Sequence, residues 1–197
     1  MRAQRGFYRK RGRIGRFKDA ALTLCFLFLL VLIAARLQGG ASDPVVGPFR
    51  VVDGDTLAAG AERLRLADID APELDQTCEH DGQEWACGQE AKAILQRLMQ
   101  RGSAECHGSE RDRYGRLIVN CFVDGRTVGG EMVRSGMAVT TSLVTYRREQ
   151  ADAQTDAKGI WAGPFTLPAE WRRERRLEQE GGDFLSGMKD LLSLEWL

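Results

Sequence analysis

The chain of 197 residues has few of the side chains that build zinc modules and histidine-centred catalytic sites. It contains two histidines, His80 in an expected loop and His107 at the end of an expected strand. Nothing in the sequence orients them as a catalytic pair, so solvated or structural roles are expected for both. The five cysteines include no Cys-x-x-Cys pair, and their spacing therefore disfavours a structural zinc module.

Net charge is also missing, with 28 basic and 28 acidic residues, but the two signs are unevenly distributed. Residues 1–41 hold nine basic residues and one acid, Asp19. Residues 42–197 therefore hold 19 basic and 27 acidic residues, a net charge of −8. Because nonspecific affinity for nucleic acid comes from neutralising phosphates, this part of the chain is expected to be a poor general binder of nucleic acid.

A basic segment followed by an apolar run occupies the N-terminus. The first 18 residues carry six arginines, two lysines and no acid, and residues 20–35 carry no charge. A buried core helix would usually keep a polar face, whereas this run is apolar all round. The pattern predicts a signal peptide or signal anchor at 20–37, a basic cytoplasmic tail at 1–19, and everything that follows outside the cytoplasm.

Cleavage of this segment is left open by the sequence. The small residues Gly39, Gly40 and Ala41 permit cleavage after Ala41, which would release a secreted protein. The apolar run is longer than most signal-peptide cores and shorter than a span of about 20 residues, although Arg36-Leu37 can lengthen it if Arg36 snorkels. We favour an uncleaved anchor in the inner membrane, with the domain facing the periplasm or exterior.

The stretch from residue 51 to residue 73 predicts a β-meander that ends in a loop rich in carboxylates. Val51 and Val52 are β-branched, and Asp53-Gly54 is a turn signal after which the chain becomes extended again. A second reversal at Ala59-Gly60-Ala61 precedes residues 63–69, which alternate apolar and polar positions over the length of a strand.

Four charged side chains are gathered in this meander. In an unbroken strand Arg65 and Asp70 would point to opposite faces, because their positions differ by an odd number. They converge only if the strand ends or bulges near Asp68, as strands beside active sites often do. Pro72 then keeps the preceding residue extended. The candidate residues of this stretch are Asp55, Arg65, Asp70 and Glu73.

The rest of the domain alternates helices and strands. We expect a loop at 74–88, an amphipathic helix at 89–100, strands at 103–107 and 117–123, and short helices at 128–135 and 146–158. A five-stranded meander interrupted by about three helices fits an α+β domain built on an OB-type Greek-key β-barrel. This domain is expected at 47–164, after a linker at 38–46.

Residues 165–197 differ in character from the domain before them. Residues 168–180 are dense in charge, and Gly181-Gly182 is expected to break the chain. Residues 183–197 place Phe184, Leu185, Met188, Leu191, Leu192 and Trp196 on one helical stripe. We favour a C-terminal helix that packs back on the barrel; the alternative is a helix that binds a partner or a membrane surface.

Three segments resemble, in order and spacing, the signature segments of the staphylococcal nuclease (thermonuclease) family. They are DGDT at 53–56, RLADIDAPE at 65–73 and DRYGR at 112–116. The resemblance covers about residues 48–164 and implies an OB-type barrel. It also implies a Ca²⁺-dependent phosphodiesterase that cleaves DNA and/or RNA and leaves 3′-phosphate ends.

The resemblance also implies a set of site residues. Asp55, Asp70 and the carbonyl of Ala71 would bind Ca²⁺, Glu73 would be the general base, and Arg65 and Arg116 would clamp the phosphate. This chemistry is consistent with the residue types, since Ca²⁺ prefers oxygen ligands and arginines donate paired hydrogen bonds to phosphate. A metal that polarises the phosphoryl oxygen and a base for the attacking water complete the requirements. The alternative is a solvated strand edge with surface salt bridges.

The four cysteines that follow the apolar segment are expected to form disulfides if the domain is exported. Four cysteines allow three pairings, and we favour Cys78–Cys87 and Cys106–Cys121, the latter across a hairpin. Cys25 lies in the apolar segment and is expected to be inert.

Two features depart from the family pattern. Where the family has base-packing tyrosines, this chain reads Thr140-Thr141-Ser142-Leu143, with Tyr146 nearby, and the Cys-bearing loop at 74–88 could narrow access to the site. Tyr114 and Gly115 are expected to be structural. An alternative function is a non-catalytic OB-type module that binds an oligosaccharide, single-stranded nucleic acid or a protein. We favour the enzyme, because a binding domain needs no base beside a metal.

Overall fold

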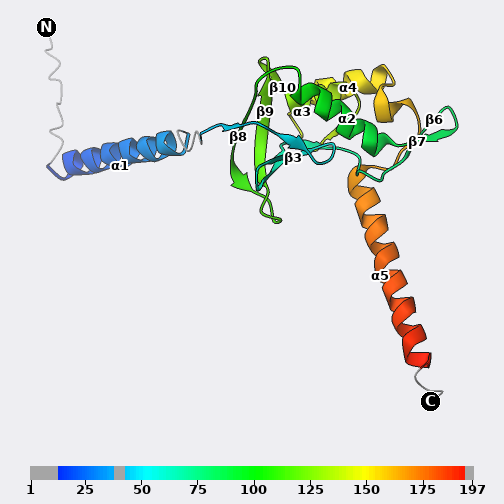
Figure 1. Cartoon of the computed structure of the whole chain (residues 1–197). Coiled ribbons are helices and arrows are strands. Elements are labelled where there is room, and N and C mark those ends of the chain that lie inside the picture. The colour runs from blue at the N-terminus through cyan, green and yellow to red at the C-terminus, as the bar shows by residue number, and fades with distance from the viewer. Residues whose placement is uncertain (1–12, 38–42, 194–197) are drawn as a thin grey trace, which may run out of the picture. The chain divides into compact units, whose positions relative to one another are not determined.

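The computed structural model describes residues 13–37 and 43–193, and the side chains of residues 18–34 and 43–181 (Figure 1). The chain divides into two compact units, Met1–Ala41 and Ser42–Leu197. Most of the expected cytoplasmic tail, most of the linker and the expected cleavage point at Ala41 lie outside the described residues.

The first unit contains one long helix, α1 (Arg13–Leu37), which includes the whole apolar run. Every described side chain of this helix, from Lys18 to Ala34, is exposed. Among the helices of the described residues, none has both the length and the apolar character needed to cross a membrane. The signal anchor therefore stays a prediction.

The second unit is built on a curled sheet that forms a half-barrel (Figure 1). The described residues contain seven strands in this sheet, where five were expected. Neighbouring strands are antiparallel except β4 and β9, which run parallel and place Arg65 opposite Ile118. The path is β1 (Val45–Val46), β8 (Ala104–Arg111), β9 (Leu117–Val123), β4 (Glu62–Leu66), β3 (Thr56–Ala59) and β2 (Arg50–Val51), and β10 (Arg126–Thr127) also pairs with β9.

Two short pairs of strands lie outside the main sheet. The pair β5 (Ile69–Asp70) and β11 (Val139–Thr140) joins the carboxylate loop to the segment after α3. The pair β6 (Cys78–His80) and β7 (Gln83–Trp85) forms a hairpin, so the expectation of loop throughout 74–88 is wrong. The turn of the hairpin is Asp81-Gly82, and both residues have positive φ. This Asp-Gly pair is the usual turn of a two-residue hairpin.

Helices α2 (Cys87–Met99) and α3 (Val128–Arg134) pack on the sheet and close the core. In α2, Ala91, Leu95 and Leu98 are buried at the spacing of one helix face, as the periodicity predicts. They meet buried strand residues such as Leu57 and Val119 in one hydrophobic cluster. The three helices expected in this domain are confirmed, the third as α4 (Arg147–Thr155), which a 3₁₀ turn at Gly159–Ala162 follows.

The last helix, α5 (Pro168–Ser193), is longer than the sequence indicates. It begins with a proline, which is well suited to the first turn because it needs no hydrogen-bond acceptor for an N–H. It continues through Gly181-Gly182, so the expected break is wrong. A helical glycine costs about 1 kcal/mol relative to alanine, which weakens a helix without forbidding it. The side chains of the apolar stripe at 183–197 lie outside the described ones, so its packing stays a prediction.

Candidate active site

The break between β4 and β5 brings the predicted acidic and basic residues together. Strand β4 ends at Leu66, and Asp68 turns the chain with a φ of 61°. The carbonyl of Asp68 accepts hydrogen bonds from Thr141 N (2.9 Å) and Thr140 Oγ1 (3.1 Å), which fix the turn. The predicted strand end near Asp68 is therefore confirmed. As a result, Arg65 Nη2 lies 2.9 Å from Asp70 Oδ1.

Asp55 is buried in the site, with 7% of its surface exposed. Its Oδ1 accepts a hydrogen bond from Thr56 Oγ1 (3.0 Å), and its Oδ2 accepts one from Ala71 N (3.2 Å). Oδ2 also forms an ion pair with Arg65 Nη1. Asp53 caps the turn before it by accepting a hydrogen bond from Asp55 N at 3.1 Å. Asp55 thus ties β3 to the loop that carries Asp70.

Arg65 lies between the two aspartates. It pairs with Asp55 and Asp70, and its Nη2 also donates to the carbonyl of Ile69 at 3.1 Å. Burial lowers the pKa of Arg65, and the attraction of Asp70 acts in the opposite direction. Arginine stays protonated in proteins, so Arg65 is a fixed cation that neutralises much of the charge of two buried carboxylates.

Arg116 is positioned by the turn between β8 and β9. Asp112 Oδ1 accepts hydrogen bonds from Tyr114 N (2.9 Å) and Arg116 N (3.0 Å), and Asp112 Oδ2 accepts one from Arg116 Nε (2.7 Å). Gly115 has a φ of 80°, which confirms its expected role in the turn. Arg116 Nη1 then reaches Thr56 Oγ1 at 3.3 Å, next to Asp55. Desolvation raises the pKa of Asp112, but the hydrogen bonds from Arg116 outweigh it and hold the pKa below its usual value.

These side chains surround one cavity of about 470 Å³. All predicted site residues line it except Asp70, which lies beside it in contact with Arg65 and Arg172. No residue of the 74–88 segment lines the cavity, so the expectation that this segment narrows access is not supported. The lining residues are Asp53, Asp55, Arg65, Ala71, Pro72, Glu73, Arg113, Tyr114, Arg116 and Arg172.

A larger cavity of about 630 Å³ lies elsewhere, between the β2 region and α2. It is lined by residues such as Phe49, Lys92 and Met99, and no carboxylate lines it. Of these two cavities, we place the candidate site at the smaller one because it combines carboxylates with four guanidinium groups.

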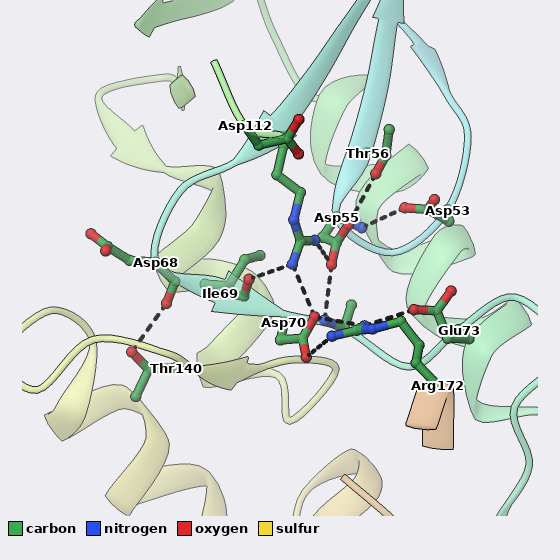
Figure 2. Close-up of polar contacts among 12 residues, drawn as sticks. Asp53, Asp55, Thr56, Asp68, Ile69, Asp70, Glu73, Asp112, Thr140 and Arg172 are labelled. Carbon is green, nitrogen blue, oxygen red and sulfur yellow. Dashed lines mark hydrogen bonds and ion pairs between the residues drawn. The ribbon is translucent and has the colours of Figure 1, made fainter. Parts of the chain in front are cut away.

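Arg172 is a site residue that sequence reasoning missed. It comes from the first turns of α5 and enters the cavity beside Asp70 and Glu73 (Figure 2). Its Nη1 lies 2.7 Å from Glu73 Oε1 and 3.1 Å from Asp70 Oδ1, and its Nη2 lies 2.9 Å from Asp70 Oδ2. Desolvation acts to lower the pKa of Arg172, but these carboxylates raise it above its usual range. The charge-dense stretch at 168–180 contains four arginines, and nothing in their spacing singles out this one.

The two tyrosines considered in the sequence lie in different surroundings, one at the cavity and one against the core. Tyr114 is 67% exposed, lines the cavity, and lies with its ring centre 5.5 Å from the Arg116 guanidinium carbon. Its ring is therefore placed where it can contact a ligand in the cavity, while its N–H belongs to the turn. Tyr146 instead packs on Gly129 and Gly130, where an added Cβ would lie 3.1 Å from its ring. It belongs to the packing around the core and does not line the cavity.

The donor chemistry of the site fits a hard divalent cation. Asp55 and Asp70 are 7% and 4% exposed, and both offer carboxylate oxygens next to the backbone of Ala71. Oxygen ligands of this kind suit Ca²⁺, which also accepts carbonyls and water. Within the part of the chain that is described, no group of three or more His, Cys, Asp or Glu residues is placed to hold a metal ion. Any cation site here therefore relies on two carboxylates completed by a carbonyl and water.

Both predicted disulfides are present. Cys78–Cys87 links β6 to the first turn of α2, and Cys106–Cys121 joins residues directly opposite each other on β8 and β9. The histidines lie apart from the cavity, as expected: His80 and His107 are each about half exposed, beside acidic neighbours.

A half-barrel packed against helices, and a cavity that joins buried aspartates to several arginines, define a class of small α+β domain with a site built from carboxylates and guanidinium groups. The family model described as "Staphylococcal nuclease homologue" matches residues 63–163. The chain belongs to the staphylococcal nuclease family.

Three relatives illustrate the range of proteins similar to this chain. The succinoglycan biosynthesis protein ExoI of Rhizobium meliloti is 36% identical over 130 residues, covering 63% of this chain and 68% of the relative. An uncharacterized endonuclease of Haemophilus influenzae is 30% identical over 166 residues, covering 79% and 86%. A micrococcal nuclease of Shigella flexneri is 32% identical over 145 residues, covering 63% and 78%.

Proposed function

We propose that this chain is a Ca²⁺-dependent nuclease that hydrolyses phosphodiester bonds in DNA and/or RNA. The observation that carries the proposal is the convergence of Asp55, Arg65, Glu73 and Arg116 on one cavity, with Asp70 beside it. Relatives that are named endonuclease and micrococcal nuclease support the same activity. Because the charge of the domain as a whole is negative, binding of the substrate would rest on the guanidinium groups of this cavity together with the cation.

Asp55, Asp70 and the carbonyl of Ala71 are the groups that would hold Ca²⁺. When bound there, the cation would polarise a phosphoryl oxygen and help to orient the phosphate. Ala71 N already donates to Asp55 Oδ2, and this contact places the Ala71 backbone next to the carboxylate.

Glu73 is the best-placed general base. Its carboxylate lines the cavity and is 35% exposed, so water can reach it. Its backbone N–H donates to the side-chain carbonyl of the buried Gln76 at 3.2 Å, which fixes the start of the side chain. A base held at the edge of this cavity can accept the proton of an attacking water.

Arg65 and Arg116 would bind the phosphate and stabilise the charge that develops in the transition state. Arg116 uses its Nε to hold Asp112 and one N–H of its Nη1 to reach Thr56 Oγ1, and its remaining terminal N–H groups would serve an anionic ligand. Guanidinium groups suit this role because they donate parallel hydrogen bonds to two phosphate oxygens.

The test is cleavage of single-stranded DNA and of RNA by the purified 197-residue chain, with Ca²⁺ or with EGTA. Glu73→Gln removes the base and keeps its size, and Glu84→Gln on the exposed β7 is the matched control. We expect Ca²⁺-dependent cleavage that falls by a factor of about 10²–10⁴ in Glu73→Gln and stays unchanged in the control. Cleavage that persists in EGTA and in Glu73→Gln would contradict the mechanism.

A binding module for an oligosaccharide, single-stranded nucleic acid or a protein is the second candidate function. The net charge of −8 in residues 42–197 and the inward packing of Tyr146 favour it. One relative is named for succinoglycan biosynthesis, which is consistent with a carbohydrate context. Ca²⁺ binding without cleavage of DNA or RNA would support this candidate over the nuclease.

The proposed location is outside the cytoplasm, with the N-terminal segment as an inner-membrane anchor or, if cleaved near Ala41, as the signal of a secreted protein. The basic lead and the apolar run support export, and two disulfides are typical of exported proteins. Fractionation of cells followed by N-terminal sequencing tests this. A chain that stays in the soluble cytoplasmic fraction with reduced cysteines would contradict it.

A further inference from the structure

The guanidinium of Arg172 takes up the oxygens that a cation at this site needs. Its two terminal nitrogens bond both oxygens of Asp70, at 3.1 Å and 2.9 Å, and one of them also bonds Glu73 at 2.7 Å. Asp70 Oδ1 accepts a further hydrogen bond from Arg65. Asp70 is thus shared between two arginines, and any divalent cation that binds it must work against Arg172.

The first turn of α5 positions Arg172 beside Asp70 and Glu73. Pro168 is buried at the start of the helix, and the carbonyl of Thr166 accepts a hydrogen bond of 2.7 Å from the fully buried side chain of Gln76. One turn further on, Arg172 faces Asp70 and Glu73, and Arg175 pairs with the exposed Asp75 at 2.7 Å. The buried Pro168 and the hydrogen bond to Thr166 therefore fix the start of α5 against the domain. Arg172 lies one turn after these contacts, so the fixed helix start positions its side chain.

Arg172 differs from Arg65 in how easily it can leave. Arg65 is part of β4, is mostly buried, and bonds the carbonyl of Ile69 as well as both aspartates. Arg172 is 40% exposed and is held at its charged end by Asp70 and Glu73. A long side chain on a helix can swing into solvent without disturbing the sheet. Of the two arginines on Asp70, Arg172 is the one that a cation can displace.

We propose that Arg172 competes with the divalent cation for Asp70, and that it thereby determines the cation concentration at which the site fills. The inference rests on the proposed function, because it takes Asp70 as a cation ligand. Arg172 also holds Glu73 until the cation arrives, so a single displacement frees both the metal ligand and the base.

The experiment measures Ca²⁺ binding by titration calorimetry, independent of activity, on the 197-residue chain. The variants are Arg172→Gln, which removes the charge, and Arg172→Lys, which keeps the charge and loses the paired hydrogen bonds. Arg175→Gln is the matched control on the same helix, since it pairs with Asp75 and does not contact Asp70. Thermal unfolding of each variant checks that it is folded.

Removal of a nearby positive charge should tighten Ca²⁺ binding by a factor on the order of 5 to 50 in Arg172→Gln. Arg172→Lys should lie between wild type and Arg172→Gln, and Arg175→Gln should bind as wild type does. Unchanged or weaker binding in a folded Arg172→Gln would overturn the inference while leaving the proposed function intact. If neither the wild type nor any variant bound Ca²⁺, the metal assignment of the proposed function would itself be wrong.

Discussion

Glu73 and Arg172 lie 99 residues apart in the sequence and meet at 2.7 Å between Oε1 and Nη1. Glu73 is the last residue of the second signature segment of the domain, whereas Arg172 belongs to a helix beyond the region matched by the family model. The proposed base is therefore in contact with a part of the chain outside the region that identifies the family. The turn between β8 and β9, which carries Arg116, Tyr114 and Asp112, and the two disulfides of the domain lead to four predictions.

Arg116→Ala should lower kcat/KM for a nucleic acid substrate by a factor of about 10²–10³, as expected when one transition-state donor is lost. Arg116→Lys should recover little, because lysine cannot keep the Nε contact to Asp112 and still present a guanidinium. Steady-state kinetics with both variants tests this. Arg126→Ala, at a largely exposed arginine on β10, is the control; an equal loss there would argue against a specific role.

Tyr114→Ala should raise KM more than it lowers kcat, because an exposed ring at the cavity can stack on a base without touching the reacting phosphate. Stacking of this kind contributes about 1–3 kcal/mol per base, which corresponds to roughly a 5- to 150-fold change in affinity. Tyr114→Phe should behave as wild type. A normal KM in Tyr114→Ala would mean that the ring serves only the turn, as the sequence suggested.

Asp112 should make stability depend on pH in the acid range. Its pKa in the folded chain is below the unfolded value, so its stabilising effect is fully present above the unfolded pKa, near 4, and is lost as the pH falls through the folded pKa. Urea unfolding of wild type and Asp112→Asn from pH 3 to pH 7 should show the variant less stable at neutral pH. The two curves should converge toward the acid end, and a difference that grows on acidification would contradict the assignment.

The two disulfides stabilise different parts of the domain, the core sheet and the hairpin before α2. Replacing Cys106 and Cys121 by alanine removes a bond inside the core sheet and should cost about 2–4 kcal/mol of unfolding free energy. Replacing Cys78 and Cys87 loosens the hairpin that precedes α2, so stability should fall by a similar amount while the cavity residues stay in place. Denaturant unfolding and Ca²⁺ titration of each double variant measure the two effects separately.

Sequence patterns predicted the structure correctly where residues close together in the chain determine the local geometry. The need for a chain break at Asp68 follows from the facing of Arg65 and Asp70, and the structure has it there with a positive φ. The pairing of Cys106 with Cys121 follows from a hairpin and is confirmed by their register. The helix periodicity of α2 is likewise confirmed by its buried face.

The parts that sequence reasoning missed depend on contacts between distant segments. The hairpin at 78–85 was not predicted, because its strands are only three residues long and too short to show an alternation of apolar and polar residues. The continuity of α5 through two glycines follows from helix propagation, which local propensity cannot reveal. Arg172 could not be distinguished from its neighbouring arginines, because the feature that selects it is Asp70, 102 residues earlier.

Gln76 connects the proposed base to the last helix through a single side chain. Its Oε1 accepts the Glu73 N–H and its Nε2 donates to Thr166, two residues before α5 begins. A displacement of α5 would therefore reach the backbone of Glu73 through this amide, in addition to reaching its carboxylate through Arg172. The C-terminal helix is thus mechanically linked to Glu73, and tension on that helix would act on the proposed general base.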